Sequence, residues 1–237
     1  MANLGYIGLG AMGGRMVDRL ITKGHTVIGY NRTKSKAQWL LDKGMKWGAT
    51  PRDVAQGADV IFVMVTDSPA LEGVADGPDG FVAGLSAGKT IIDMSTVGPV
   101  VSRETVEKVR AKGADMVDSP VSGSISTLEA GKLTMMVGGK AETFEAVKPL
   151  LLDVGMKATH VGDNGLALSM KLALNLAITT QMLAFSEGIL LAEKAGIDRK
   201  TAVEVYTNSV LASPLIQYRG PFVLNMLQGA WFVMKMV

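Results

Sequence analysis

The feature that most constrains the fold is an alternation of short β-branched segments with amphipathic segments from Ala2 to about Gly162. This alternation is typical of a parallel sheet covered by helices on both faces. The predicted strands are Leu4–Gly8, Thr26–Tyr30, Val60–Val65, Thr90–Met94, Asp115–Asp118, Leu133–Val137 and Ala158–Val161. The predicted helices between them are Met12–Thr22, Lys34–Lys43, Pro51–Gln56, Pro99–Lys112 and Ala141–Leu152. Beyond Gly162 the patterns indicate helices alone, over Leu166–Ala195, Arg199–Ser209 and, more weakly, Pro221–Met226.

This change of pattern sets the predicted domain organisation. Residues 1–162 are predicted to form a doubly wound α/β domain, and residues 163–237 a smaller all-helical domain. We expect the long segment Leu166–Ala192 to be a buried helix and not a membrane span, because polar side chains such as Lys171 and Glu187 interrupt it. Since the first strand begins almost at once and no cleavage site follows it, the sequence predicts a cytoplasmic protein.

Composition narrows the chemistry. The chain has no cysteine, which excludes a disulfide scaffold, a thiolate nucleophile and a Cys-ligated metal. Its only two histidines, His25 and His160, argue against a histidine metal cluster, so no metal site is predicted. Lys and Arg total 24 against 22 for Asp and Glu, and the net charge of +2 predicts no nucleic-acid partner.

A glycine-rich loop follows the first predicted strand directly. Three glycines stand in the G-x-G-x-x-G pattern between a strand and an amphipathic helix, where the first allows a tight turn, the second lets the backbone approach a pyrophosphate, and the third permits close helix–strand packing. The loop consists of Gly8, Leu9, Gly10, Ala11, Met12 and Gly13. The sequence therefore predicts a Rossmann-type dinucleotide site, with an ordinary glycine turn as the alternative.

The end of the second predicted strand bears on which dinucleotide is bound. An acidic residue there would hold the ribose 2′-hydroxyl of NAD, but the chain has Asn31, Arg32 and Thr33 instead. An arginine with no neighbouring acid suits the 2′-phosphate of NADP. We therefore predict NADP as cofactor and keep NAD as the alternative, in which Arg32 is only a solvated loop residue and Thr33 a helix cap.

Small hydroxyl side chains follow three further strands. In an open parallel sheet the ligand lies outside the carboxyl ends of the strands, so these positions face the expected cleft. They are Val65-Thr66-Asp67, Ser95-Thr96 and Ser119-Pro120-Val121-Ser122-Gly123-Ser124. The last segment combines hydroxyls with backbone N–H donors in a glycine-containing turn, an arrangement that suits a carboxylate. Ordinary strand-end turns remain the alternative for each.

A lysine stands in the apolar first part of the long helical segment. Lys171 and Asn175 are four residues apart and so share a helix face, with leucines on either side. A partly desolvated ammonium has a lowered pKa, which suits an acid–base group that works near neutral pH. The alternative is a lysine that reaches to the surface with its charge in water.

Taken together, these motifs resemble those of the β-hydroxyacid dehydrogenases, a family that includes 3-hydroxyisobutyrate dehydrogenase and the glyoxylate/succinic semialdehyde reductases. The resemblance rests on four motifs in order: the glycine loop with Met16, Asp93-Met94-Ser95-Thr96 with Pro99, Asp118 to Gly123, and Gly165 with Lys171 and Asn175. Asn31-Arg32-Thr33 looks like the NADPH-using glyoxylate/succinic semialdehyde branch. The resemblance implies a Rossmann domain followed by an all-α domain of the 6-phosphogluconate dehydrogenase type.

Roles follow from the resemblance residue by residue. It implies that Lys171 is catalytic and that Ser122, Gly123 and Asn175 bind the substrate. It also implies that the nicotinamide cofactor contacts Gly8, Gly10, Gly13, Arg32, Val65, Thr66 and Thr96. The implied reaction is hydride transfer between NADP(H) and a small carboxylate-bearing carbonyl compound, by a homodimer or tetramer assembled through the C-terminal helices.

The chain departs from the family in two places. Ser124 stands where the family often has a second glycine, so we expect a narrower carboxylate nest. Family members also continue with a Lys-Asp-Leu segment and further helices, whereas this chain ends after Trp231–Val237, so we expect an incomplete helical domain. Three other functions stay open: an imine reductase, a dehydrogenase-like module that binds cofactor without catalysis, and an assembly role for the long helix.

Overall fold

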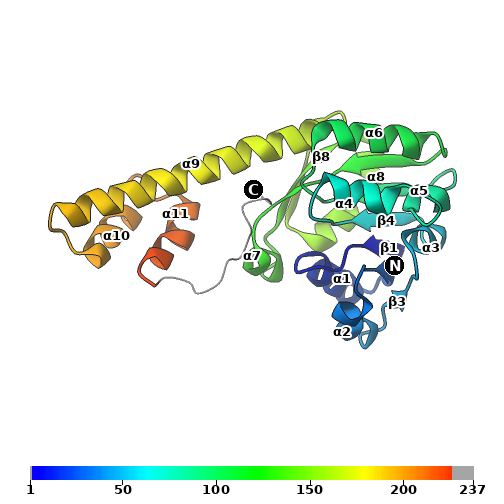
Figure 1. Ribbon diagram of the computed structural model, residues 1–237, viewed down its shortest axis with the longest axis horizontal. Helices are drawn as coiled ribbons and strands as arrows, with labels where there is room; N and C mark the ends of the chain where they lie inside the picture. Colours follow the sequence, from blue (N-terminus) through cyan, green and yellow to red (C-terminus); the bar gives the residue numbers. More distant parts are fainter. Residues whose placement is uncertain (1, 226–237) are drawn as a thin grey trace. The chain divides into compact units, whose positions relative to one another are not determined.

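The structure is a computed structural model that describes residues 2–225 (Figure 1). The chain divides into two compact units, Met1–Lys171 and Leu172–Val237. The strands are β1 Asn3–Ile7, β2 Thr26–Tyr30, β3 Lys46–Trp47, β4 Val60–Val63, β5 Thr90–Asp93, β6 Asp115–Asp118, β7 Val121–Ser122, β8 Thr134–Gly138 and β9 Lys157–Gly162. The closing segment Trp231–Val237 and the end of the predicted helix Pro221–Met226 lie outside the described residues.

Helices account for most of the remaining described chain. Those of the first unit are α1 Gly13–Thr22, α2 Gln38–Leu41 after the 3₁₀ turn η1 Lys34–Ala37, α3 Pro51–Gln56, α4 Ser68–Ala75, α5 Phe81–Gly84, α6 Pro99–Arg110, α7 Ile125–Glu129 and α8 Ala141–Val154. They are followed by α9 Leu166–Lys194, α10 Arg199–Thr207, α11 Pro214–Arg219 and the 3₁₀ turn η2 Gly220–Val223. The predicted boundary after residue 162 falls between β9 and α9 and stays a prediction, since the division by contacts falls inside α9.

One mixed, mainly parallel sheet organises the first unit. Within the described residues its strand order is β3-β2-β1-β4-β5-β6-β8-β7, with β9 paired to β8. Strand β1 pairs with β2 on one side and with β4 on the other, so the chain reverses its direction of winding at β1. This reversal places a crevice at the carboxyl ends of β1 and β4, where doubly wound sheets bind ligands.

Helices cover both faces of this sheet, as the alternation of patterns predicts. On β5, Ile92 packs into a core with α1 and α8, whereas its neighbour Ile91 packs into a second core with α3, α4 and α6. Adjacent strand residues point to opposite faces, so a strand buried on both sides reads as a continuous apolar run. This is why β4 and β5 can be predicted from short apolar segments.

The sheet is not wholly parallel, which corrects one expectation. Strand β8 runs antiparallel to β6 and β7, because the chain turns back through the short helix α7 and Gly131, whose φ is +69°. An antiparallel neighbour needs no crossover helix. The next strand, β9, is reached through α8 and pairs with β8 in parallel.

The second unit is helical, and its small core contains Phe185, Ile189, Ala202, Val203 and Ile216. The expectation that the long helix is buried is wrong for the described chain, because Leu176, Leu183 and Leu191 are exposed. By length and composition alone α9 could cross a membrane, and a single helix of this kind is weak evidence. The predicted helix at Pro221 is instead the turn η2, and the helix α11 that precedes it was not predicted.

Candidate functional site

The glycine loop joins β1 to α1 at the carboxyl end of the sheet. Gly8 has a φ of +99°, and a Cβ there would collide with the carbonyl oxygen of Met64. A Cβ at Gly13 would collide with the carbonyl oxygen of Gly8, whereas one at Gly10 would meet no atom within 4 Å. Packing therefore requires the first and third glycines, and the second leaves open space beside the backbone that a phosphate can use.

The first turn of α1 suits an anion. Its N-cap residue Met12 offers no side-chain hydrogen bond, and no acidic residue lies in the first turn. Backbone N–H groups and the helix dipole at such an end favour a negatively charged ligand. The open position at Gly10 and the uncapped helix start together fit the pyrophosphate of a dinucleotide.

The end of β2 lies against this loop. The Asn31 side chain accepts a hydrogen bond from the Leu9 N–H at 3.2 Å and donates one to the Thr33 carbonyl at 2.9 Å. Arg32 and Thr33 are exposed. Asn31 therefore fixes the shape of the loop, while Arg32 is free in the described structure to reach a phosphate in solvent.

A pocket of about 560 Å³ opens beside the loop. Its lining residues are Leu9, Gly10, Ala11, Arg15, Asp18, Lys36, Trp39 and Glu129. Of the basic residues after β2, Lys36 lines this pocket, whereas Lys34 lies over the Trp47 ring, 5.3 Å from its centroid. The roles of Arg15 and Trp39 in this pocket were not predicted. Arg15 lies on α1 and Trp39 on α2, and no local sequence pattern shows that tertiary packing brings them to one pocket.

A buried serine, Ser95, links the segments that follow β4 and β5 by hydrogen bonds. The Val65 N–H donates to the Ser95 hydroxyl at 2.9 Å, and the Ser95 N–H donates to the Asp93 carboxylate at 3.0 Å. Thr66 is exposed and Thr96 is half-buried. The structure therefore places Val65, Thr66 and Thr96 at neighbouring strand ends. Ser95, whose hydroxyl was expected to face the cleft, is instead buried and bonded to Val65 and Asp93.

Asp93 is fully buried, and burial raises its pKa to about 6, against the opposing effect of its hydrogen bonds with Ser95. Because the folded-state pKa lies above the ordinary value of 3.8, the folded chain holds the proton more tightly than the unfolded chain. The free energy of unfolding that this group contributes is therefore greatest below pH 4 and falls as the pH rises to about 6.

Replacing Asp93 by asparagine is expected to remove this pH dependence, since the amide keeps an acceptor for the Ser95 N–H and carries no charge. Relative to the unmodified chain, the variant should gain up to about 3 kcal/mol in unfolding free energy between pH 4 and pH 6. Urea unfolding of both proteins at several pH values measures the difference. A difference that stays constant across this range would contradict the prediction.

The segment after β6 contains the predicted carboxylate nest. Gly123 has a φ of +141° and is exposed, and Ser122 is half-buried at the end of β7. Ser124 is the N-cap of α7 and accepts a hydrogen bond from the Thr127 N–H at 3.4 Å. The Ser124 hydroxyl thus caps α7. The expectation that Ser124 narrows the carboxylate nest stays a prediction.

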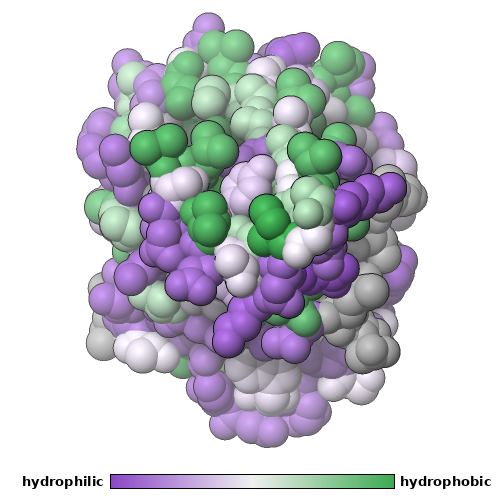
Figure 2. All heavy atoms as spheres, turned by 90° about the vertical axis from the view of Figure 1, so that its left-hand side faces the viewer, coloured by the Kyte–Doolittle hydropathy of each residue, from purple (hydrophilic) through white to green (hydrophobic). Residues whose placement is uncertain are grey.

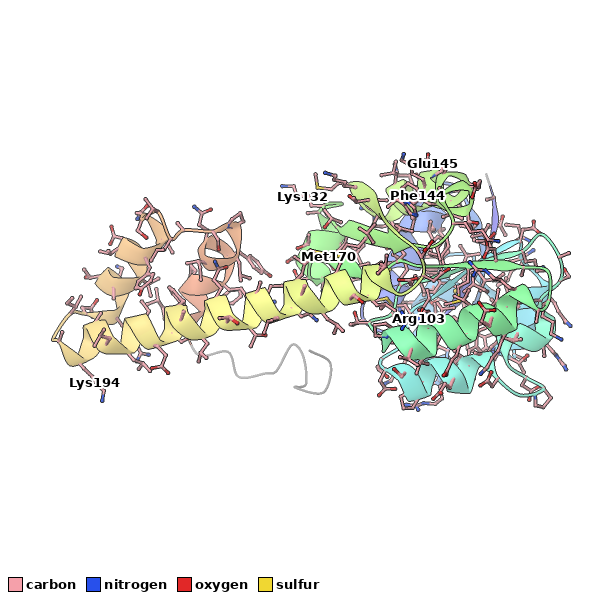
Figure 3. The ribbon with its side chains drawn as sticks, turned by 90° about the horizontal axis from the view of Figure 1, so that it is seen from above. Arg103, Lys132, Phe144, Glu145, Met170 and Lys194 are labelled. Atoms are coloured by element: carbon pink, nitrogen blue, oxygen red, sulfur yellow. The ribbon has the colours of Figure 1, made fainter. Side chains whose placement is uncertain are left out.

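Lys171 lies in the second turn of α9, directly after Met170, which is labelled in Figure 3. It is half-buried, and burial lowers the pKa of its ammonium below the ordinary lysine value. Asn175 follows four residues later on α9 in the second unit, where its carbonyl accepts the Thr179 hydroxyl at 3.0 Å. All the predicted site residues except Asn175 belong to the first unit.

Family models match both parts of the chain. Residues 3–162 match the NAD-binding domain of 6-phosphogluconate dehydrogenase. Residues 165–234 match the NAD-binding model of NADP-dependent 3-hydroxyisobutyrate dehydrogenase.

Individual relatives agree with these matches. Glyoxylate/succinic semialdehyde reductase 2 of Arabidopsis thaliana is 33% identical over 233 residues, which cover 98% of this chain and 65% of that protein. The 2-hydroxy-3-oxopropionate reductase of Escherichia coli is 36% identical over 221 residues, covering 92% and 74%. The structure of Mycobacterium tuberculosis 3-hydroxyisobutyrate dehydrogenase with L-serine has a TM-score of 0.85 at 26% identity, covering 93% of this chain and 75% of that one.

The chain thus spans about two thirds to three quarters of the length of these relatives. The resemblance noted in its motifs is confirmed by both family models and by the fold. From these matches, the chain belongs to the 3-hydroxyisobutyrate dehydrogenase family of β-hydroxyacid dehydrogenases, with an NAD(P)-binding Rossmann domain followed by a helical region.

Proposed function

We propose that the chain catalyses reversible hydride transfer between NADP(H) and a small carboxylate-bearing aldehyde or keto acid, with Lys171 as the general acid and base. The observation that carries this proposal is the half-buried Lys171, whose pKa is lowered by burial and whose helix begins at the carboxyl end of β6. A lysine in that state gives up a proton more readily than one in water.

The nicotinamide ring, when bound, supplies or accepts the hydride. During reduction the Lys171 Nζ donates a proton to the carbonyl oxygen, and during oxidation it takes that proton back. The backbone N–H groups near Gly123 and the Ser122 hydroxyl hold the substrate carboxylate, and the Asn175 side chain orients the carbonyl oxygen. This anchor decides which carbonyl carbon reaches the cofactor, so it sets the substrate length.

The names of the relatives support the substrate class. One is called a glyoxylate/succinic semialdehyde reductase, another a 2-hydroxy-3-oxopropionate reductase, and a solved family member was studied with L-serine. The compounds in these names are short carbon chains that carry a carboxylate. Such a compound suits the exposed glycine turn at Gly123 better than a deep apolar pocket.

Turnover on a substrate panel tests the proposal. NADPH oxidation by the purified chain would be followed with glyoxylate, succinic semialdehyde, tartronate semialdehyde and methylmalonate semialdehyde, with a cyclic imine as a further arm. The proposal expects turnover on at least one of the acids. Turnover on the imine alone would favour an imine reductase, and NADPH binding without any turnover would favour a non-catalytic module.

The cofactor preference gives a separate prediction. Replacing Arg32 by aspartate is expected to lower the ratio of NADPH to NADH efficiency by about 10-fold or more, because a carboxylate repels the 2′-phosphate and can hold a ribose hydroxyl. Ratios of kcat/KM for the two cofactors measure the effect. Lys36→Ala is measured beside the Arg32 variant, because Lys36 is another basic residue after β2 and lines the pocket beside the loop. An unchanged ratio in the Arg32 variant would contradict the predicted role of Arg32.

The exposed leucines of α9 support assembly with a second copy of the chain. Figure 2 shows hydrophobic side chains among hydrophilic ones on one face of the molecule. Leu176, Leu183 and Leu191 are 70%, 61% and 72% exposed, and such apolar helix surface is stable in water when another protein covers it. We therefore propose a homodimer or tetramer, for which a solution mass equal to the 25.0 kDa monomer would be the contrary result. The cytoplasmic location stays a prediction, which fractionation of cells expressing a tagged chain tests.

A further inference from the structure

The helix that carries Lys171 begins on a buried carboxylate. Asp118, the last residue of β6, is 0% exposed, and its Oδ1 accepts the Gly165 N–H at 2.8 Å. The Asn164 side chain also donates to this oxygen, at 3.3 Å. The N–H of Gly165, the residue directly before α9, is thus satisfied by a side chain that lies 47 residues earlier in the sequence.

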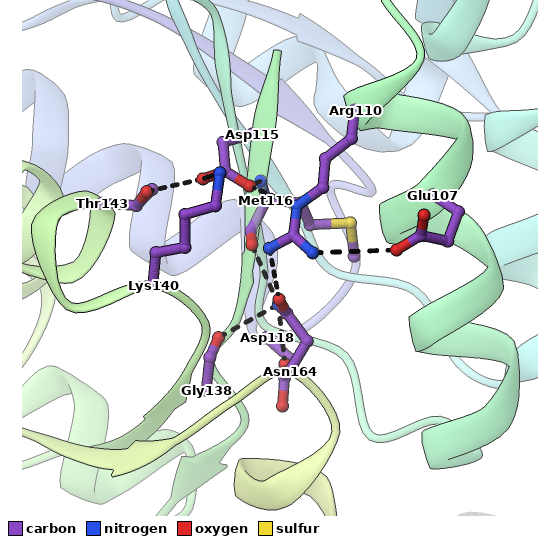
Figure 4. Close-up of polar contacts among 9 residues, drawn as sticks. All are labelled: Glu107, Arg110, Asp115, Met116, Asp118, Gly138, Lys140, Thr143 and Asn164. Atoms are coloured by element: carbon purple, nitrogen blue, oxygen red, sulfur yellow. Dashed lines mark hydrogen bonds and ion pairs between the residues drawn. The ribbon is translucent and has the colours of Figure 1, made fainter. Parts of the chain in front are cut away.

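Asn164, directly before this contact, joins three elements of the first unit. Its Nδ2 donates to the Met116 carbonyl at 2.9 Å and to the Gly138 carbonyl at 3.3 Å (Figure 4). Its Oδ1 accepts a hydrogen bond from Arg110 at 2.9 Å. Asn164, two residues before α9, is therefore bonded to β6, β8 and α6 at once.

Arg110 is itself held in place. Its Nε donates to Asp115 at 3.0 Å, and Asp115 also receives Thr143 at 2.8 Å and Lys140 at 3.2 Å. Burial by itself would raise the pKa of Asp115, but these hydrogen bonds outweigh it and lower the pKa, so the carboxylate is charged near neutral pH. Arg110 consequently has little freedom to move away from Asn164.

Two glycines allow close packing at this junction. A Cβ at Gly138 would lie 2.8 Å from Asp118 Oδ2, and one at Gly165 would lie 2.5 Å from the Arg103 guanidinium. Gly165 also has a φ of +89°, which favours glycine. The absence of a Cβ thus lets Asp118 lie close to Gly138 and Arg103 lie close to Gly165 at the start of α9.

The position at which α9 begins determines where Lys171 lies. Lys171 follows Gly165 by six residues, about 9 Å along the helix. Between them Ala167 and Leu168 are fully buried, whereas Ser169 and Met170 are exposed. The first turn of α9, which contains Ala167 and Leu168, is therefore the part of the helix before Lys171 that packs into the first unit.

We propose that Asp118 is a positioning residue for Lys171, which acts by accepting the Gly165 N–H directly before α9 and so fixing the helix start. This rests on the proposed function, in which Lys171 transfers the proton. Asp118 does not contact the substrate. A shift of about 1 Å in the position of a reacting group lowers the rate by as much as about 100-fold.

The test is Asp118→Asn, which keeps an acceptor for the Gly165 N–H and removes the charge at the helix start. In the full chain, kcat for reduction is expected to fall about 10- to 100-fold, with the dissociation constant of NADPH changed less than about 3-fold. Amide hydrogen exchange over residues 165–171 is expected to become faster, because the first turn loses its charged cap. The matched control is Asp53→Asn, which removes a capping carboxylate at α3, away from α9, and is expected to keep kcat.

A second variant covers the case in which Asp118→Asn does not fold. Arg110→Met breaks the bond to Asn164 but leaves Asp118 intact and Asp115 paired with Lys140 and Thr143. We expect a smaller loss in kcat, about 3- to 10-fold, with the same faster exchange over residues 165–171.

The pH profile separates positioning from a direct effect of the charge. If Lys171 moves into water, its apparent pKa in kcat rises toward the ordinary value, whereas loss of a nearby negative charge alone lowers it. A rise supports the proposal, and a fall overturns it. Normal kcat and unchanged exchange in an active Asp118→Asn protein would overturn the positioning role alone. Full turnover in Lys171→Met, or none in the unmodified chain, would overturn the proposed function and this inference with it.

Discussion

Replacing Lys171 by alanine is expected to lower kcat for carbonyl reduction by about 10²- to 10⁴-fold, the range associated with loss of a general acid. The dissociation constant of NADPH should change little, because the predicted cofactor contacts come from the strand ends and not from α9. Single-turnover NADPH oxidation measures the loss, and fluorescence titration measures binding. Lys194→Ala is the control, because Lys194 is an exposed lysine on the same helix (Figure 3).

The sign of the pH dependence follows from the lowered pKa of Lys171. Reduction requires the protonated lysine, so its rate is expected to fall as the pH rises through this pKa, at a pH below the ordinary value of 10.5. Oxidation requires the neutral lysine and should gain rate over the same range. In Lys171→Met both limbs should disappear. Limbs that persist in this variant would assign the proton to another group.

Replacing Gly13 by alanine is expected to lower the free energy of unfolding by about 2–4 kcal/mol, because the new Cβ would collide with the backbone carbonyl of Gly8. The α1 helix would have to move away from β1, and the core residues Met16 and Val17 would move with it. Urea denaturation measures this loss.

Gly10→Ala is the matched comparison on the same loop. Its new Cβ meets no atom within 4 Å, so stability should change by less than about 1 kcal/mol, as expected for an exposed position. The methyl group nevertheless enters the space left for a phosphate, and NADPH should bind about 10- to 100-fold more weakly. Equal effects of the two substitutions on stability, or full NADPH affinity in Gly10→Ala, would contradict the assignment of this loop.

Local signals made much of the first unit predictable. The helix Pro51–Gln56 was predicted with the observed bounds, because Pro51 suits a first helical turn. Strands β2 and β6 were also predicted residue for residue. The glycine loop was predicted in its observed context between a strand and a helix.

Short elements escaped prediction for a physical reason. Helices α5 and α7 have four and five residues, too few for a helical period to repeat. The two-residue strands β3 and β7 are defined by pairing with a neighbour, which one segment cannot reveal. The exposure of α9 could not be read from its sequence either, because apolar residues around the whole helix do not say what covers them.

Some residues of the candidate site could likewise be predicted from the sequence, and others could not. Lys171 and the strand-end residues could be named from type and spacing, although their roles remain proposals. Ser95, Lys36 and Asp118 could not be given their present places, because each depends on a partner that packing brings near from a distant part of the chain.

The bonds of Asn164 to Met116 and Gly138 also bear on how family members can be recombined. A chimera joined at residue 162 would take Asn164 and Gly165 from one parent and Asp118 from the other, so the helix start and its acceptor would come from different sequences. A crossover after Leu168 would keep these partners together. Engineers who exchange the helical parts of such enzymes to transfer substrate preference should therefore regard the first turn of α9 as part of the Rossmann domain.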